Sequence, residues 1–337
     1  MIKITKPGLL TSVQDLGRYG YQKYGVITSG VMDTTAHRIA NLLVGNDEKE
    51  ATLELTLLGP DMEFSEDTLI SICGGNLSPS INGKSVKLWR SVLVKAGSKL
   101  KFGGCKTGCR AYLAVAGGFD VPEVMNSKST YIRAGIGGHN GKALQNDDEL
   151  SVGELNELSR QISGVLAEEV KENSFAEMQW TISSDFIVSS VSKPNVRVMK
   201  GRQYEWFTKD SQMKLFTEHF EVTSQSDRMG YRLKGPELSL ENEQEMLSEA
   251  VSFGTIQVPS EGNPIVLLAD RQTTGGYPKI GQIATVDLSI MAQLKPGDKV
   301  QFVEVSHEVA QQLYLDREKK LHQLKQGIAL KIRQKTK

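Results

Sequence analysis

Short apolar runs divided by turn residues fill positions 51–153, and this pattern constrains the fold most strongly. The runs are rich in β-branched and aromatic residues and are too short for independent helices, so they predict strands. Many short strands with regular turns are typical of a sandwich or a barrel. The pair Asn82-Gly83 predicts a tight hairpin, because both residues tolerate positive φ. The predicted strands are 53–58, 69–73, 92–94, 99–102 and 111–115, with turns at Gly59-Pro60, Gly74-Gly75-Asn76, Ala96-Gly97 and Gly103-Gly104.

The same pattern returns between residues 195 and 305, and the two β-rich halves resemble each other. Leu58-Gly59-Pro60 is echoed by Lys234-Gly235-Pro236, and the stretch 15–21 is loosely echoed by 227–231. Such repetition indicates a tandem duplication. Only the first half carries a helix between its repeated motifs, with Asp33 as the predicted N-cap and apolar residues at helical spacing up to Gly45. We expect His37 in this helix to be packed or solvated rather than catalytic.

Two segments of opposite charge flank the second half. Residues 153–180 are rich in glutamate and carry Leu155, Leu158 and Ile162 at helical spacing, which predicts an acidic helix and linker. Residues 306–337 contain eight Lys or Arg against three acids and predict a basic helical tail. We expect a solvated face there, with contact to a partner or RNA as the alternative. The predicted domains are therefore 1–152, a linker at 153–180, 181–305 and the tail at 306–337.

Length and composition exclude several classes of protein. A chain of 337 residues is long enough for two domains with separate cores. Lys plus Arg and Asp plus Glu both number 40, so no net charge favours nucleic acid or an acidic membrane surface. No apolar run approaches the 18 residues of a membrane span, and we expect a cytoplasmic, unanchored protein. The three cysteines argue against a disulfide framework, and five histidines leave too few ligands for a metal site, so we predict none.

Three polar, glycine-bearing segments are candidates for a functional site. The first follows the pattern strand, turn, strand, polar loop over Gln257–Gly281, and its loop 270–278 offers an acid, a guanidinium, hydroxyls and a phenol beside two glycines. The second is 14–21 and the third is 126–141. Arginine forks and backbone N–H groups in such loops suit a small carboxylate, amide or acyl phosphate. The alternative for the loop 270–278 is a hydrogen-bonded crossing at the end of a barrel.

Other chemistries find little support in the sequence. The chain has no Gly-x-Ser-x-Gly turn for a serine hydrolase and no phosphate-cradling glycine loop. Met199-Lys200 is followed by Gly201-Arg202 rather than by the Met-Lys-Met context of a biotin carrier, so we predict no covalent biotin on this chain.

Several long motifs in order resemble the biotin-dependent carboxyltransferase family, which includes allophanate hydrolase subunit 2-like domains and KipA-type proteins. The resemblance covers about residues 1–305 and departs from the family pattern at Gly201-Arg202, at Lys142 and at Asn126, where glycine is expected. Its motifs are Gln14-Asp15-x-Gly17-Arg18-x-Gly20-Tyr21, Ser29-Gly30-x-Met32-Asp33, Ala116-Gly117-Gly118, Ser129-Thr130-Tyr131, Ser226 to Arg232, and Asp270 to Pro278.

The resemblance implies a fold and a function. The fold is mainly β, with two tandem cyclophilin-like β-barrel domains, a few short helices and a C-terminal helix. The function is that of a subunit in an ATP-dependent 5-oxoprolinase complex, with ATP and Mg²⁺ used by the complex and with a KipI-like B subunit and an A subunit as partners. That complex opens 5-oxo-L-proline to L-glutamate. The alternatives are a KipA-type regulator that antagonises a KipI-like kinase inhibitor, and the carboxyltransferase half of a urea or amide carboxylase.

The same resemblance implies roles for the residues of the three segments. We expect Arg18, Arg228 and Arg271 to hold anions, although each arginine could instead form a structural pair with a nearby aspartate. Asp15, Asp33 and Asp270 are expected to orient groups or transfer protons. The expected substrate-binding residues are Gln14, Tyr21, Ser129, Thr130, Tyr231, Gln272, Thr273, Thr274, Gly275, Gly276 and Tyr277.

Overall fold

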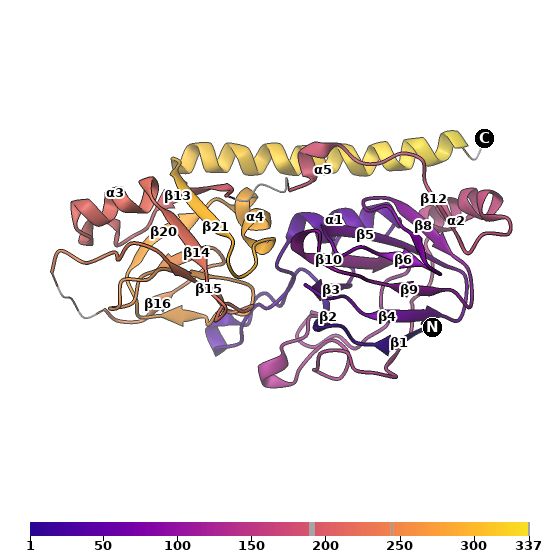
Figure 1. Ribbon diagram of the computed structural model, residues 1–337, viewed down its shortest axis with the longest axis horizontal. Coiled ribbons are helices and arrows are strands. Elements are labelled where there is room, and N and C mark those ends of the chain that lie inside the picture. The colour runs from indigo at the N-terminus through magenta and orange to yellow at the C-terminus, as the bar shows by residue number, and fades with distance from the viewer. Residues whose placement is uncertain (189–192, 243, 245, 336–337) are drawn as a thin grey trace. The chain divides into compact units, whose positions relative to one another are not determined.

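The chain forms two compact units, and each unit contains residues from distant parts of the sequence. Unit 1 comprises Met1–Arg18, Asp33–Val188 and Lys320–Lys337, and unit 2 comprises Tyr19–Met32 and Ser189–Lys319. The computed structural model describes residues 1–188, 193–242, 244 and 246–335 (Figure 1). The expected mainly β architecture is confirmed, and no helix in the described ranges is long and apolar enough to cross a membrane.

Two six-stranded antiparallel sheets make up the body of unit 1. The strand order of the first sheet is β11 (Glu149–Leu150), β1 (Ile2–Lys6), β4 (Asp61–Phe64), β9 (Lys99–Lys101), β6 (Ser80–Ile81) and β7 (Lys84–Ser85). The order of the second is β12 (Phe175–Glu177), β8 (Ser91–Val94), β5 (Thr68–Asn76), β10 (Thr107–Val115), β3 (Thr52–Thr56) and β2 (Leu10–Gln14). One core takes apolar side chains from both sheets, among them Met62 and Leu100 from the first and Leu53, Ile72 and Leu113 from the second.

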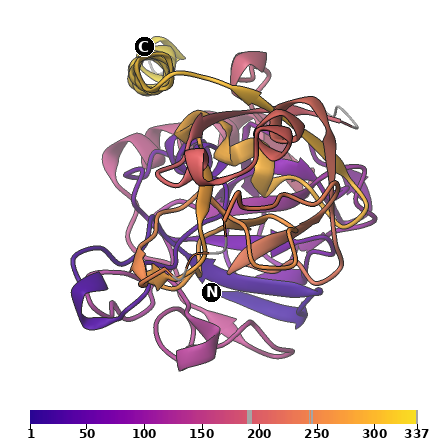
Figure 2. The same cartoon turned by 90° about the vertical axis from the view of Figure 1, so that its left-hand side faces the viewer.

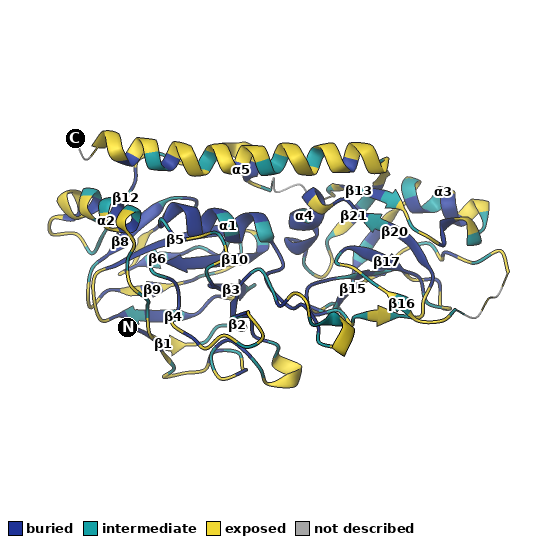
Figure 3. Ribbon diagram, turned by 180° about the vertical axis from the view of Figure 1, so that it is seen from behind, coloured by how far each residue is buried: buried dark blue, intermediate teal, exposed yellow. Residues whose placement is uncertain are grey.

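The local signals of the first half hold in the structure. The five strands expected between 51 and 153 are present, and β6 and β7 form the predicted hairpin with φ of 47° at Asn82 and 81° at Gly83. Helix α1 (Thr34–Leu43) begins at Asp33, whose carboxylate accepts from Ala36 N–H at 3.0 Å. The helix lies against the second sheet and is largely buried (Figure 3). The hydroxyl of Ser71 donates to the carbonyl of Ala40 there.

The acidic segment joins unit 1 more closely than a linker would. It forms helix α2 (Glu157–Val170), as expected, and then adds strand β12 to the edge of the second sheet. Ile162 and Leu166 on the helix are fully buried. The pairing of β12 with β8 joins positions about eighty residues apart, so no local pattern in the sequence indicated it.

Unit 2 is a closed seven-stranded barrel (Figure 2). Among its described strands, β13 and β21 form the one parallel pair, and the other pairs are antiparallel. Its core includes Phe220 and Phe302, with ring centroids 5.6 Å apart. The strand order is β13 (Asn195–Lys200), β20 (Lys279–Ile283), β17 (Thr255–Gln257), β18 (Ile265–Leu267), β15 (Gly230–Lys234), β14 (His219–Val222) and β21 (Lys299–Glu304).

Smaller elements surround the barrel. Strand β16 (Glu249–Ala250) pairs with β19 (Thr274–Gly275) outside it, and the helices are α3 (Lys209–Thr217) and α4 (Leu288–Ala292). Short 3₁₀ turns lie at η1 (Gln22–Tyr24), η4 (Tyr204–Trp206) and η5 (Thr285–Asp287) in this unit, and at η2 (Ile132–Ala134) and η3 (Ser184–Phe186) in unit 1. The expected succession of strand, turn, strand and polar loop over 257–281 is confirmed by β17, β18 and the loop before β20.

The basic tail is helix α5 (His307–Lys335), and its polar face is exposed (Figure 3). In unit 1 its residues Leu321, Ile328 and Ile332 are buried at helical spacing. Lys335 pairs with Glu169 of α2 at 3.3 Å, and Lys320 pairs with Asp185 at 3.1 Å. The positive charge of the tail is therefore partly matched within the chain by Glu169 of the acidic segment and by Asp185.

Candidate functional site

Asp15 ties the N-terminal motif of unit 1 to a segment more than a hundred positions away. Its carboxylate accepts from the hydroxyls of Ser127 at 2.7 Å and Ser129 at 2.5 Å. It also accepts from the backbone N–H groups of Lys128 at 2.6 Å and Gly17 at 2.8 Å. The side chain is buried. The structure thus brings the candidate segments 14–18 and 126–141 together, and Asp15 positions one against the other.

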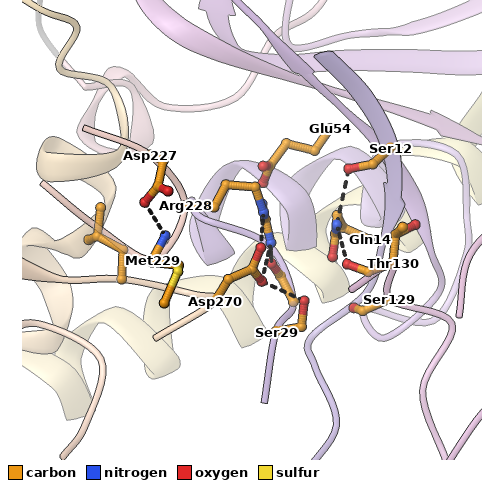
Figure 4. A network of polar contacts seen from close by, with 12 residues as sticks. Ser12, Gln14, Ser29, Glu54, Ser129, Thr130, Asp227, Arg228, Met229 and Asp270 are labelled. Atoms are coloured by element: carbon orange, nitrogen blue, oxygen red, sulfur yellow. Dashed lines mark hydrogen bonds and ion pairs between the residues drawn. The ribbon is translucent and has the colours of Figure 1, made fainter. Parts of the chain in front are cut away.

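Arg18 and Gln14 fix the same segment through its backbone. Arg18 is fully buried and donates from Nε to the carbonyl of Val124 at 3.0 Å and from Nη2 to the carbonyl of Ser129 at 2.7 Å. Gln14 donates to Thr130 O at 3.1 Å and to Ser12 Oγ at 3.0 Å (Figure 4). Gln14 Oε1 has no hydrogen-bond partner among the described residues. Because these side chains bond to buried backbone, they hold the loop in place.

Strained backbone gives the loop 124–141 its shape. Met125 and Asn126 have φ of 55° and 58°, in the left-handed region that glycine and asparagine tolerate best. This conformation explains why a glycine is expected at position 126. A Cβ on Gly137 would lie 2.0 Å from Ser129 O, and one on Gly138 would lie 1.9 Å from Thr130 Oγ1. The glycines therefore allow the loop to lie directly against the segment 129–130.

In unit 2, Arg228 and Asp270 form a buried ion pair that holds residues from the start of the chain. Arg228 Nε lies 2.9 Å from Asp270 Oδ2, and Nη2 lies 3.2 Å from Oδ1 (Figure 4). The same Nη2 donates to Gly30 O at 2.5 Å, and Ser29 Oγ donates to Asp270 Oδ1 at 2.6 Å. Ser29 itself has a positive φ of 54°. For Arg228 this geometry corresponds to the alternative considered in the sequence analysis, a structural pair with a nearby aspartate.

Arg271 differs from Arg228 in having no ion pair among the described residues. Its Nη1 donates to the carbonyl of Leu268 at 3.2 Å, and its guanidinium carbon lies 5.8 Å from the ring centroid of Phe253. Nε is buried and has no hydrogen-bond partner in the described part of the chain. Burial lowers the pKa of Arg271, whereas Tyr19 and Asp270 act to raise it. An arginine side chain stays positively charged at neutral pH even when burial lowers its pKa, so the guanidinium of Arg271 can bind an anion.

The rest of the loop 270–278 presents a partly exposed wall. Gln272, Thr274, Gly276 and Tyr277 are exposed, and Thr273 and Gly275 are half-buried. Backbone bonds hold the loop: the N–H of Val251 donates to Thr273 O, and Gln257 Nε2 donates to Tyr277 O at 3.2 Å.

Three other predicted site residues lie apart from these contacts. Asp33 caps helix α1, and its N–H donates to the hydroxyl of Tyr112 at 2.8 Å. Tyr231 is buried in the core of the barrel, and its hydroxyl donates to Leu294 O at 2.9 Å. Tyr21 is half-buried beside turn η1.

His37 is a packed residue, as the sequence indicated. It is fully buried, and its Nδ1 lies 2.9 Å from Thr52 Oγ1. Burial lowers its pKa to about 4. Within the described ranges no three His, Cys, Asp or Glu residues gather as a metal site.

The sequence did not single out a charged group beside the loop of Arg271. Lys279 Nζ lies 2.8 Å from Glu249 Oε2, and Arg202 Nη1 lies 3.3 Å from Glu249 Oε1. These three residues line a hollow of about 410 Å³. Lys279 directly follows the predicted loop 270–278, so its position in the sequence could have marked it as a candidate site residue. Glu249 reaches the loop only through the pairing of β16 with β19, which local sequence does not indicate.

The fold and these motifs define a class of protein: the chain belongs to the carboxyltransferase domain family, subdomains A and B, which matches residues 24–304. Among curated proteins, it is 37% identical to the C subunit of 5-oxoprolinase from Escherichia coli, over 96% of this chain and 97% of the relative. It is 35% identical to the C subunit of 5-oxoprolinase from Haemophilus influenzae, over 96% of this chain and 98% of the relative.

Larger proteins contain a similar stretch. The solved urea amidolyase of K. lactis is similar with a TM-score of 0.85 and 30% identity, covering 96% of this chain and 20% of the solved chain. Urea amidolyase of Lachancea kluyveri is 32% identical over 96% of this chain and 18% of its own length. The chain therefore spans about a fifth of the length of these relatives.

Proposed function

We propose that this protein is a subunit of an ATP-dependent complex that opens 5-oxo-L-proline to L-glutamate. The observation that carries the proposal is coverage. The chain spans 97% and 98% of two relatives that are C subunits of 5-oxoprolinases, but only 18% of a urea amidolyase. A C subunit belongs to a multi-subunit assembly, and we extend that organisation from those relatives to this chain. Its proposed partners are an A subunit and a KipI-like B subunit, in the cytoplasm.

The chemistry of a lactam gives the polar groups of this chain a role. An unactivated lactam is a poor electrophile, and phosphorylation of its oxygen creates a leaving group before hydrolysis. ATP with Mg²⁺ would supply that phosphoryl group to the complex. The negative charge that develops must be stabilised by fixed donors. Arg271 is the best placed of the three predicted arginines, because Arg228 already binds a carboxylate and Arg18 is fully buried against two backbone carbonyls. Arg271 makes one bond to a backbone carbonyl and is only partly buried.

Arg228, Asp270 and Asp15 have a supporting role in this proposal. The pair of Arg228 and Asp270 fixes the start of the loop that carries Arg271. Asp15 fixes the loop 124–141 in unit 1 through three donors of that loop. Rigid support of this kind is what a site needs to hold its donors in a productive geometry.

A second function also has a specific observation in its favour. The solved urea carboxylase of Kluyveromyces lactis is 30% identical to this chain with a TM-score of 0.85, and the shared family is that of a carboxyltransferase domain. The alternative is therefore a carboxyltransferase half that acts on urea or a related amide. It requires a biotin carboxylase and a biotinyl carrier, and we predict that this chain carries no biotin of its own.

The test is ATP-dependent formation of glutamate from 5-oxo-L-proline by this protein with candidate A and B subunits, omitting each component in turn. We expect activity only when all three are present. A parallel reaction supplies urea, bicarbonate, a biotin carboxylase and its carrier. Carboxylation of urea that depends on this protein, without glutamate formation in the first reaction, would support the alternative and reject the proposed function.

A further inference from the structure

A hollow in unit 2 lies next to the loop of Arg271 and contains a nearly buried lysine. It has a volume of about 410 Å³ and is bordered by residues of β16, β17 and β20 and of the segments that follow β13 and β16. Lys279 is the first residue of β20, directly after the loop 270–278. The residues that line the hollow are Gly201, Arg202, Glu249, Ala250, Val251, Ser252, Thr255, Lys279, Gly281 and Gln282.

The ammonium group of Lys279 has unused donors. Its side chain is only 10% exposed, and among the described residues Nζ makes one hydrogen bond, to Glu249 Oε2 at 2.8 Å. A protonated lysine has three N–H donors. The other two donors have no acceptor among the described residues, so they can bind an additional oxygen ligand.

The charge of the group favours an anion as that ligand. Lys279 and Arg202 are two cations, and Glu249 is the carboxylate among the described residues that contacts both. These three side chains together carry a net charge of plus one, which a single carboxylate would neutralise. Arg202 is 76% exposed, so it is free to turn toward an incoming ligand.

The uncharged polar side chains that line the hollow are bonded to one another or to backbone. Gln282 Oε1 accepts from Thr255 Oγ1 at 2.8 Å and from Ser252 Oγ at 3.0 Å, while its Nε2 donates to Phe253 O at 2.8 Å. These side chains keep the hollow in shape and leave the charged residues as the recognition groups. The backbone is close-packed at one side, since a Cβ on Gly201 would lie 2.2 Å from Lys279 O.

We propose that this hollow binds the carboxylate of a small monoanionic ligand, with Lys279 as the main donor and Arg202 as the second. The inference rests on the proposed function and narrows it: 5-oxo-L-proline carries a carboxylate at neutral pH, whereas urea is neutral. The site thereby selects a lactam that bears an acid over a simple amide.

Glu249 has an opposing effect in this site. It holds the ammonium of Lys279 in place, and its charge also repels an incoming carboxylate. Replacing it by glutamine keeps the shape and removes the repulsion. We therefore expect replacement of Lys279 to weaken binding of the carboxylate and replacement of Glu249 by glutamine to strengthen it. A merely structural ion pair does not predict these opposite changes in affinity.

The test measures binding to the full chain by isothermal titration calorimetry. The ligands are 5-oxo-L-proline, its neutral primary amide and urea. We expect the acid to bind at least tenfold more tightly than the amide or urea. Lys279→Met should weaken binding of the acid about tenfold or more, Lys279→Arg should retain part of it, and Glu249→Gln should tighten it severalfold. The matched control is Lys209→Met, because Lys209 is an exposed lysine that pairs with Glu205 outside the hollow.

Each outcome decides the inference separately from the proposed function. Equal affinity for acid and amide, no binding of the acid, or weaker binding by folded Glu249→Gln would overturn it. Circular dichroism of Lys279→Met and Lys279→Arg identifies a folding defect, in which case the acid–amide ratio and Glu249→Gln decide. Turnover by the complex with an unchanged KM in Lys279→Met rejects the site but keeps the function. Selective carboxylate binding without turnover supports the site and rejects the function.

Discussion

Arg228 grips both carboxylate oxygens of Asp270 inside unit 2, at 2.9 Å and 3.2 Å. Their side chains are 7% and 11% exposed, so neither charge is well solvated. The same pair binds Ser29 and Gly30 from the beginning of the chain. The relationship therefore joins three distant parts of the sequence at the base of the candidate loop.

Removing both members of this pair should destabilise the protein less than the sum of the two single removals. Asp270→Ala leaves the Arg228 guanidinium buried without its main counter-ion, and we expect a loss of about 3–5 kcal/mol in the free energy of unfolding. The double variant with Arg228→Ala should lose less than the sum of the single changes. Urea denaturation of the full double-mutant cycle measures the coupling. Additive losses would show that the two residues do not depend on each other.

Arg271 should affect turnover with little effect on stability. Arg271→Ala removes one bond to a backbone carbonyl and a contact with Phe253, so the melting temperature should change little. If the guanidinium stabilises charge in the reaction, kcat should fall by roughly 10²–10³-fold. Arg160→Ala is a suitable control, because Arg160 on α2 also donates to a backbone carbonyl, that of Leu155. Full turnover by Arg271→Ala would remove this residue from the proposed mechanism.

Asp15→Asn should loosen the loop 124–141. The amide N–H₂ of asparagine would face groups that are themselves donors, including the N–H of Lys128 and the hydroxyl of Ser127. We expect a loss of about 1–3 kcal/mol. Hydrogen exchange at Lys128 and its neighbours should speed up, while exchange in β18 of unit 2 stays the same. Unchanged protection of the loop would contradict the role given to Asp15.

His37 should make the protein less stable in acid. Its folded pKa of about 4 lies below the unfolded value of 6.5, so the unfolded chain binds the proton first. Its contribution is fully present above pH 6.5 and is lost as the pH falls to 4, by about 3 kcal/mol at most. His37→Gln should remove this part of the slope. Unfolding free energies at pH 7, 5.5 and 4.5 for both proteins test the prediction, and parallel curves would oppose it.

Two glycines of one loop should respond differently to alanine. Gly135 and Gly137 both have positive φ, of 65° and 71°. A Cβ on Gly135 meets nothing within 4 Å, whereas one on Gly137 would lie 2.0 Å from Ser129 O. Gly135→Ala should cost only the left-handed strain of about 1–2 kcal/mol. Gly137→Ala should cost more and displace the segment 129–130, as thermal unfolding would show; equal melting temperatures would refute the contact.

The elements that the sequence predicted are those encoded by neighbouring residues. Asn82-Gly83 determines a hairpin within four positions, and Asp33 caps a helix whose apolar spacing is local. The candidate loop was found because its polar residues follow one another. Periodicity and turn chemistry are local properties, so they are readable without the fold.

The missed features depend on contacts between distant residues. Strand β12 pairs with β8, about eighty residues earlier in the chain. Glu249 lies beside the loop 270–278 because its strand β16 pairs with β19. From the sequence, the same anion-binding role was predicted for Arg18, Arg228 and Arg271. Only the structure separates Arg228, which binds a carboxylate, from Arg271, which has no ion pair among the described residues.

The assignment of residues 19–32 to unit 2 has a consequence for how the chain is made. Ser29 emerges from the ribosome 241 positions before Asp270, the residue that it binds. At about 5–20 residues per second, that interval is on the order of 10–50 s. Throughout it, the early segment has no barrel to join, although the strands on both sides of it can already pair. During synthesis from the N-terminus, residues 19–32 therefore remain without their partners in unit 2 until Asp270 has been made.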